Sequence, residues 1–365
     1  MFRLRRGEMM EFESKRQYEA DELEFDETQA KIAVIGIGGA GNNCVTRLFD
    51  KGITGAETIA VNTDKVHLQI SRAHRKVLIG YEVTKGLGAG GYPEIGRKCA
   101  IESKPAIKDL LKGIDMLFLT CGLGGGTGTG AGPVIAEVAR EMGIIVISTV
   151  FWPFQYEGAR LAKAEEGLYE FRRHSDTVIV IENDRIAEIA GRKPIREAFE
   201  IGDQLVANMI KAITETIALP SMVNLDYADV RAVMTSGGVA MIGVGESSSE
   251  RRAEEAIKKA LSSPLLDVSC EGATGALIHV TGGESLSLDE VNQIGQVVTK
   301  SLDPNAQVVW GARIDPSFDN KLRVMAIITG VKSPHILGTI TERRRVLVPS
   351  PEKAKISQEL GIDVL

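Results

Sequence analysis

The chain has 365 residues, of which 44% are apolar and 25% are charged, a composition typical of a globular protein with two domains. The formal charge of −6 does not provide the basic surface that a protein needs to bind the phosphate backbone of nucleic acid. The four cysteines lie far apart without a C-x-x-C pair, and the apolar runs are too short to cross a membrane. We therefore expect a cytoplasmic protein with reduced thiols, without a zinc site, a transmembrane span or a nucleic-acid partner.

Short apolar stretches alternate with amphipathic segments in the first half of the chain. Residues 1–30 precede them and are charged and poor in apolar side chains, so we interpret them as a solvated extension. The stretches are rich in β-branched residues and span residues 31–35, 58–61, 76–79, 116–120, 144–150 and 177–181. This alternation predicts an α/β domain with a doubly wound parallel sheet over residues 31–196.

A long helix and a smaller α+β domain are predicted next. Apolar residues recur every four positions along residues 197–219, which predicts a central helix that ends before Pro220. Strand-like and helical stretches then alternate, at 239–244, 250–261, 276–281, 289–302, 307–314 and 322–329. Ser287 and Glu290 have the spacing of a capping box. Residues 220–330 are therefore predicted to form an α+β domain, and residues 331–365 a tail.

The first predicted strand leads directly into a glycine-rich turn. Residues 36–43 read GIGGAGNN, and Gly36, Gly38 and Gly41 satisfy G-x-G-x-x-G between a strand and a helix. Such a turn lets the backbone approach a phosphate at a helix N-terminus. Taken alone, the motif favours a Rossmann-type NAD-dependent oxidoreductase, in which Asp64 would bind the ribose.

Two further glycine loops change this interpretation. The sequence CGLGGGTGTGAGP follows the strand at 116–120, and its backbone N–H groups and threonine hydroxyls are suited to a triphosphate. Pro133 suits the first turn of the helix after it. A third loop, GLGAGGYP, occupies residues 86–93. Loops at the carboxyl ends of parallel strands converge, and chain turning alone does not account for three of them. Neither a P-loop lysine motif nor a kinase motif set occurs.

These motifs together resemble one family. GGGTGTG, preceded by GIGGAGNN and VNTD and followed by NLDYADVR, resembles the FtsZ family of the tubulin superfamily, the prokaryotic cell-division GTPases. The similarity covers residues 31–330, and the acidic extension and short tail are similar to those of archaeal members. The resemblance implies binding of GTP or GDP with Mg²⁺, self-assembly, and a position in the mid-cell division ring.

The resemblance also implies which residues surround the phosphates. The first and second loops would contribute Gly38, Gly39, Ala40, Asn42, Asn62 and Asp64. Gly90 and Gly91 would lie near the γ-phosphate. The central loop would cradle the α- and β-phosphates with Gly124, Gly125, Gly126, Thr127, Gly128, Thr129 and Gly130. Asp64 would help to hold Mg²⁺ through water.

Ribose and base contacts are implied further along the chain. Glu157 matches a family glutamate near the ribose, but Leu161 stands where the family has arginine. Arg160 lies one residue earlier, about 100° away around a helix, which leaves its role as a phosphate clamp open. An ordinary charge in the first turn of a helix is the alternative for Glu157.

The base would be held by Asn183, Phe199 and Asp203, with Phe199 stacked on the ring. The Asp203 carboxylate can accept hydrogen bonds from N1–H and the amine of guanine, whereas adenine presents an acceptor at N1. Without the resemblance, an exposed helix acid is the simpler interpretation of Asp203.

Candidate catalytic residues lie in SMVNLDYADVR at 221–231. Asn224, Asp226 and Asp229 provide an amide and two carboxylates that can orient a water for attack on the γ-phosphate. Asp226 as a helix N-cap is the alternative. The resemblance implies that this loop enters the nucleotide site of the next subunit, which makes a head-to-tail homopolymer.

Two other functions are alternatives to the GTPase. An oxidoreductase would not need the GGGTGTG loop. A GTP-binding structural protein without turnover would not need the carboxylates of Asp226 and Asp229. The resemblance further implies a membrane-tethering partner at the tail, which ends LGIDVL and carries Arg343–Arg345. A frayed chain end is the alternative there.

Overall fold

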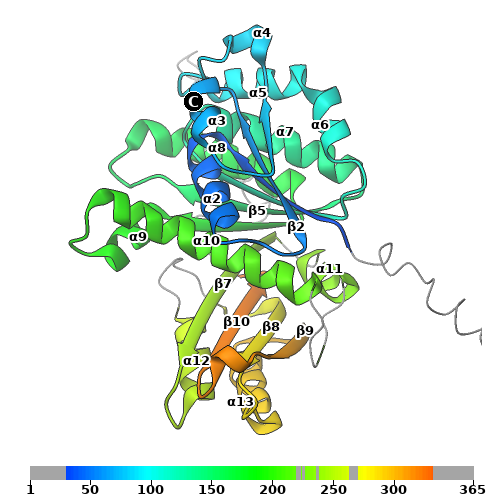
Figure 1. Ribbon diagram of the computed structural model, residues 1–365, viewed down its shortest axis with the longest axis vertical. Helices are drawn as coiled ribbons and strands as arrows, with labels where there is room; N and C mark the ends of the chain where they lie inside the picture. Colours follow the sequence, from blue (N-terminus) through cyan, green and yellow to red (C-terminus); the bar gives the residue numbers. More distant parts are fainter. Residues whose placement is uncertain (1–29, 219–222, 224–226, 236–237, 263–269, 332–365) are drawn as a thin grey trace, which may run out of the picture.

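The computed structural model describes residues 30–218, 223, 227–235, 238–262 and 270–331. The predicted extension and the predicted tail beyond Val331 lie outside these residues. The strands of the described part form one 10-stranded sheet with the order β3-β2-β1-β4-β5-β6-β7-β10-β8-β9. Figure 1 shows the long helix α10 (Ile195–Ala218) crossing the molecule between a larger half with β1–β6 and a smaller half with β7–β10.

The strands of the larger half are parallel to their neighbours. They are β1 (Ile32–Ile37), β2 (Ala56–Asn62), β3 (Arg75–Leu78), β4 (Met116–Gly122), β5 (Ile145–Trp152) and β6 (Thr177–Glu182). Every residue of β1 and of β6 is buried, as expected when helices cover both faces of a parallel sheet. The predicted strands are confirmed, with small shifts at their ends, and so is the predicted α/β fold with its parallel sheet.

Helices cover the two faces of this sheet. They are α2 (Gly38–Asp50), α3 (Lys65–Ile70), α4 (Tyr81–Thr84), α5 (Pro93–Glu102), α6 (Lys104–Leu110), α7 (Thr127–Glu141), α8 (Gly158–His174) and α9 (Asn183–Ala190). One core joins the sheet to α5, α7 and α8, with Phe171 fully buried in it. A second core, on the other face, joins the sheet to α2 and α10, with Leu48 and Ile210 fully buried. The doubly wound arrangement follows from these two cores.

The start of α7 differs from the prediction. The helix begins at Thr127, inside the glycine loop, and Gly130 N donates to Gly126 O at 3.0 Å. Pro133 therefore lies inside the helix rather than in its first turn. Close packing explains the early start, since a Cβ on Gly130 would lie 1.8 Å from Pro93 O at the start of α5. Glycine at position 130 therefore allows α5 to pack closely against α7, in addition to the role of glycines in turning the chain.

The smaller half is an α+β layer on the same sheet. It contains α11 (Tyr227–Thr235), β7 (Gly238–Ser247), α12 (Arg252–Leu261), β8 (Ala273–Gly282), α13 (Leu288–Thr299), β9 (Leu302–Ile314), a 3-10 turn (Pro316–Phe318) and β10 (Leu322–Thr329). β7 continues the parallel sheet beside β6, whereas β10 runs antiparallel to both β7 and β8. α12 and α13 cover one face through a third core.

Two predicted helix boundaries in this half can be compared with the structure. The capping box is confirmed, since Ser287 accepts from Glu290 N and the Glu290 side chain accepts from Ser287 N. The predicted C-terminal end of this helix at residue 302 is wrong, because Leu302 pairs with Ala273 as the first residue of β9. None of the helices in the described part of the chain combines the length and apolar character needed to cross a bilayer.

Candidate nucleotide site

Four loops meet at the carboxyl edge of the parallel strands. A Cβ on Gly38, where φ is +71°, would lie 3.3 Å from Gly128 N in the central glycine loop. A Cβ on Gly126 would lie 2.8 Å from Cβ of Ala89 in the third loop. Thr63 Oγ1, after β2, lies 2.7 Å from Thr127 Oγ1. The predicted convergence of the glycine loops is therefore present in the structure.

The central glycine loop has a packed side and an open side. Cβ atoms on Gly126, Gly128 and Gly130 would all collide with backbone or neighbouring side chains. In contrast, no described atom lies within 4 Å of a Cβ built on Gly125 or on Gly91. Thr129 is buried, with its methyl group against Gly167 of α8, so its side chain packs in the core. The open side of the central loop is therefore the side of Gly125, and Gly91 of the third loop borders open space as well.

Two helix N-termini at this edge are suited to an anion. α2 and α7 begin in the glycine loops, and within the described residues neither has a side-chain cap or an acidic residue in its first turn. The N–H groups of a first turn have no partner inside the helix and carry the positive end of the helix dipole. The two helix N-termini therefore present free N–H groups of the kind that suits an anion, without a lysine.

The side chains of Asn42 and Asn62 form hydrogen bonds that connect the loops after β1 and β2. Asn42 is fully buried. In the amide orientation that its partners require, its Nδ2 donates to Gly36 O at 2.7 Å and to Val61 O at 3.2 Å, and its Oδ1 accepts from Asn62 Nδ2 at 2.9 Å. A nucleotide contact of the Asn42 side chain does not fit this position. The next residue, Asn43, is exposed.

Asp64 caps α3 at the same edge. Its Oδ1 accepts from Val66 N at 2.9 Å and from His67 N at 3.0 Å, which is an ordinary N-cap. A Cβ on Gly88 would lie 4.0 Å from its other oxygen, Oδ2, so the carboxylate faces the third loop. Among the described residues, no group of three or more metal-ligating side chains occurs.

Arg160 lies one residue before the position where the family has arginine, and the packing of α8 explains this. Leu161 packs against the core of the larger half, whereas a Cβ on Gly124 would lie 2.8 Å from Cβ of Arg160. Arg160 Nη1 lies 3.3 Å from Glu157 Oε2, and the arginine side chain is exposed. Arg160 and Glu157 therefore lie together beside the central glycine loop.

The predicted base-binding residues come from α9 and α10. Asn183 and Phe199 line one cavity of about 200 Å³, together with Phe154, whose ring is edge-to-face with that of Phe199 at 6.2 Å. Asp203 lies one turn after Phe199 on α10, and its carbonyl lies 3.9 Å from Cys44 Sγ in α2. Burial raises the pKa of the Asp203 carboxyl from 3.8 to about 7, against the opposing effect of Arg47.

The described part of the candidate catalytic segment, which contains Asp229, lies at the other edge of the sheet. Asn224 and Asp226 lie outside the described residues, but Asp229 is half-buried in the first turn of α11. In the same turn, Tyr227 Oη donates to Asp115 O at 2.9 Å. Asp115 directly precedes β4, whose far end leads into the central glycine loop. The length of β4, about 20 Å, therefore separates Asp229 from the glycine loops.

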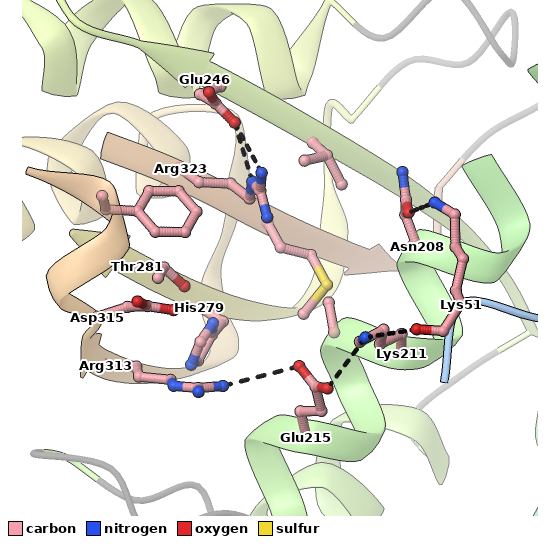
Figure 2. Close-up of a pocket in the computed structure, with 14 residues that line it drawn as sticks. Lys51, Asn208, Lys211, Glu215, Glu246, His279, Thr281, Arg313, Asp315 and Arg323 are labelled. Atoms are coloured by element: carbon pink, nitrogen blue, oxygen red, sulfur yellow. Dashed lines mark hydrogen bonds and ion pairs between the residues drawn. The ribbon is translucent and has the colours of Figure 1, made fainter. Parts of the chain in front are cut away.

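A larger cavity of about 560 Å³ lies elsewhere, between α10 and the smaller half (Figure 2). Glu215 of α10 forms ion pairs with Arg313 of β9 at 3.7 Å and with Lys211 at 3.6 Å. The His279 ring points into this cavity from β8, and its Nε2 has no hydrogen-bond partner among the described residues. Burial, followed by the charge of Arg313, lowers the pKa of His279 from 6.5 to about 4.

We expect His279 to make the fold sensitive to acid. The unfolded chain takes up a proton near pH 6.5, but the folded chain does so only near pH 4, so stability falls as the pH falls between these values. The full effect is roughly 3 kcal/mol. Urea unfolding of the parent and of His279→Gln, compared across this range, isolates the contribution from that of other groups. Equal pH slopes in the two proteins would refute it.

Comparisons with known proteins agree with this geometry. A family model described as Tubulin/FtsZ family, GTPase domain, matches residues 31–191, and the FtsZ family C-terminal domain matches residues 238–332. Cell division protein FtsZ 2 of Methanocaldococcus jannaschii is 55% identical over 322 residues, which are 87% of this chain and 85% of that protein. Cell division protein FtsZ 1 of Pyrococcus furiosus is 52% identical over 341 residues, 93% of this chain and 90% of that protein.

A solved structure gives the same result. The empty FtsZ dimer of M. jannaschii superposes with a TM-score of 0.79 at 46% identity, covering 90% of this chain and 98% of that chain. These matches confirm the resemblance to archaeal FtsZ and favour the GTPase over both the oxidoreductase and the protein without turnover. The chain belongs to the FtsZ family of cell-division GTPases.

Proposed function

We propose that copies of this GTPase join head to tail and that GTP is hydrolysed only where two copies meet. One observation carries the proposal: the glycine loops and Asp229 lie at opposite edges of the same parallel sheet, about one strand length apart. A γ-phosphate in the glycine loops is too far from Asp229 of the same chain. A neighbouring copy, stacked along the strand direction, brings its own Asp229 to that phosphate.

In this proposal one edge of the sheet binds the nucleotide and the opposite edge carries the catalytic carboxylates. Gly39, Gly125 and Gly91, together with the N-termini of α2 and α7, bind the phosphates. Arg160 and Glu157 lie at the side of the central loop, and Phe199, Asn183 and Asp203 bind guanine. Oδ2 of Asp64 would help to hold Mg²⁺ through water, since this ion keeps several waters.

The opposite edge supplies the acid groups for hydrolysis. Asp229, together with Asn224 and Asp226 from the segment before α11, orients the attacking water at the γ-phosphate of the next copy. Val223, which precedes Asn224 in the chain, pairs with Ala312 of β9 in the smaller half. Because two different surfaces meet, the contact is open and propagates as a filament instead of closing as a dimer.

Exposed apolar side chains on α3 and in the third glycine loop support a contact at this edge. Val66 and Ile70 of α3 and Leu87 of the third loop are exposed, the last by 86%. Apolar side chains that gather in this way on a surface are typical of a protein contact. They lie beside Asp64 and the third loop, where the next copy would stack.

We further propose that the filament acts in a cytoplasmic ring at mid-cell. The tail, residues 331–365, would bind a membrane-tethering partner through its apolar end, while Arg343–Arg345 add weak attraction to anionic lipid. Support for these points comes from the sequence resemblance and from the division proteins among the relatives.

Turnover at different protein concentrations tests the proposal. With saturating GTP and Mg²⁺, phosphate release per protomer should rise steeply with protein concentration and follow light scattering, because each hydrolytic site needs two copies. GDP should give neither signal, and ATP should give little. A rate per protomer that stays constant from dilute to concentrated protein, across the threshold of scattering, would reject assembly-dependent hydrolysis.

A further inference from the structure

His67 lies at the open side of the proposed phosphate site. It is half-buried on α3, the helix that Asp64 caps. Beyond the adjacent residues and the backbone of α2, a Cβ built on Gly39 would have His67 Nε2, at 4.0 Å, as its one described neighbour within that distance. The imidazole therefore borders the first glycine loop at the N-terminus of α2.

The hydrogen bonds around Asn62 fix the orientation of its amide. Its Oδ1 accepts from Thr63 N at 2.9 Å and from Asp64 N at 3.2 Å, so this atom is the oxygen and the other is the NH₂ group. One hydrogen of that NH₂ group points to Asn42. The other faces His67 Nδ1 at 3.5 Å.

This contact selects the tautomer of the imidazole. A donor that faces Nδ1 requires a lone pair there, so the proton of the neutral ring is on Nε2. Nε2–H then points toward the open space beside Gly39. At this atom the protein presents a hydrogen-bond donor to the place where the acceptor oxygens of a phosphate chain would lie.

We propose that His67 binds the nucleotide, with Nε2–H donating to a non-bridging phosphate oxygen beside Gly39. Phosphate oxygens only accept hydrogen bonds, which matches the tautomer that Asn62 imposes. The contact adds one side-chain donor to a site otherwise built from backbone N–H groups. The proposal rests on the nucleotide site described above and adds to it a residue that none of the glycine motifs contains.

Two substitutions separate a phosphate contact from a packing role. His67→Leu keeps most of the volume but has no donor, whereas His67→Gln keeps a side-chain N–H and cannot become charged. We expect His67→Leu to weaken GDP or GTP binding roughly tenfold or more, since the acceptor is charged, and His67→Gln to stay within about threefold of the parent. Calorimetric titration of nucleotide-free protein measures each affinity.

Guanosine, which has no phosphate, is the matched control ligand. Its affinity should be the same in the parent and in both variants. If the parent fails to bind GDP, the nucleotide site itself is refuted. If the parent binds and His67→Leu binds equally well, or if guanosine weakens as much as GDP does, only the role of His67 is refuted.

The tautomer can be observed directly. The chain has 5 histidines, so ¹⁵N-histidine spectra are simple, and the signals lost in His67→Leu assign this ring. We expect the neutral tautomer to carry its proton on Nε2, and on addition of GDP a larger shift of Nε2 than of Nδ1. A neutral tautomer that carries its proton on Nδ1 would overturn the proposal.

Discussion

Replacing Asp229 by asparagine is expected to lower GTP turnover by roughly a hundredfold or more, because a positioned carboxylate that polarises the attacking water contributes about 10²–10⁴-fold. Asparagine keeps the shape of the side chain in the first turn of α11 but removes its charge. Affinity for GTP should stay close to that of the parent, since the glycine loops lie at the other edge of the sheet. Phosphate release and equilibrium binding, measured on the same preparation, check both expectations.

Mixing two inactive variants tests whether the carboxylate comes from a neighbour. Asp203→Ala has an impaired guanine site but an intact Asp229, so its copies can complete the sites of Asp229→Asn copies. In a random equimolar filament about a quarter of the contacts combine an intact nucleotide site with an intact Asp229, and turnover should recover accordingly. A mixture no faster than the sum of its components would mean that Asp229 acts within its own chain, or not at all.

The sheet could be predicted because its signals are local in the sequence. β1 and β6 are buried on both faces and therefore read as uninterrupted β-branched and aliphatic runs. The capping box at Ser287 needs only two residues three positions apart. The start of α7 was mispredicted because glycine is a weak helix former, and the packing of α5 on Gly130 is a contact with a distant part of the chain.

The candidate site was predictable in outline for a topological reason. Loops after parallel strands meet at one edge, so three glycine loops in one chain predict a common site. The sequence does not distinguish glycines that admit a neighbouring helix, such as Gly130, from those that border open space, such as Gly125. His67 belongs to no motif, and its role follows only from the amide orientation of Asn62. Whether Leu161 or Arg160 faces the loop likewise depends on the rotation of α8.

Asp203 should couple guanine binding to proton release. Burial raises its pKa to about 7 in the absence of nucleotide, although guanine N1–H and the guanine amine need an ionised carboxylate as acceptor. Affinity for GDP should therefore be constant at high pH and fall up to about tenfold for each pH unit below the pKa of Asp203. Titration calorimetry in buffers of different ionisation enthalpy should detect protons released near pH 7.

Asp203→Asn removes this titration and changes the base that fits. We expect GDP binding to weaken roughly tenfold to a hundredfold, because one charge-assisted acceptor becomes an N–H group facing the guanine amine. Xanthine carries a carbonyl oxygen in place of that amine, so the asparagine amide can donate to it and still accept from N1–H. The variant should therefore prefer XDP to GDP, which competition binding measures. If Asp203→Asn keeps the parental affinity for GDP and the parental pH dependence, guanine is recognised by another group, and the half-buried carboxyl interacts with the charge of Arg47 instead.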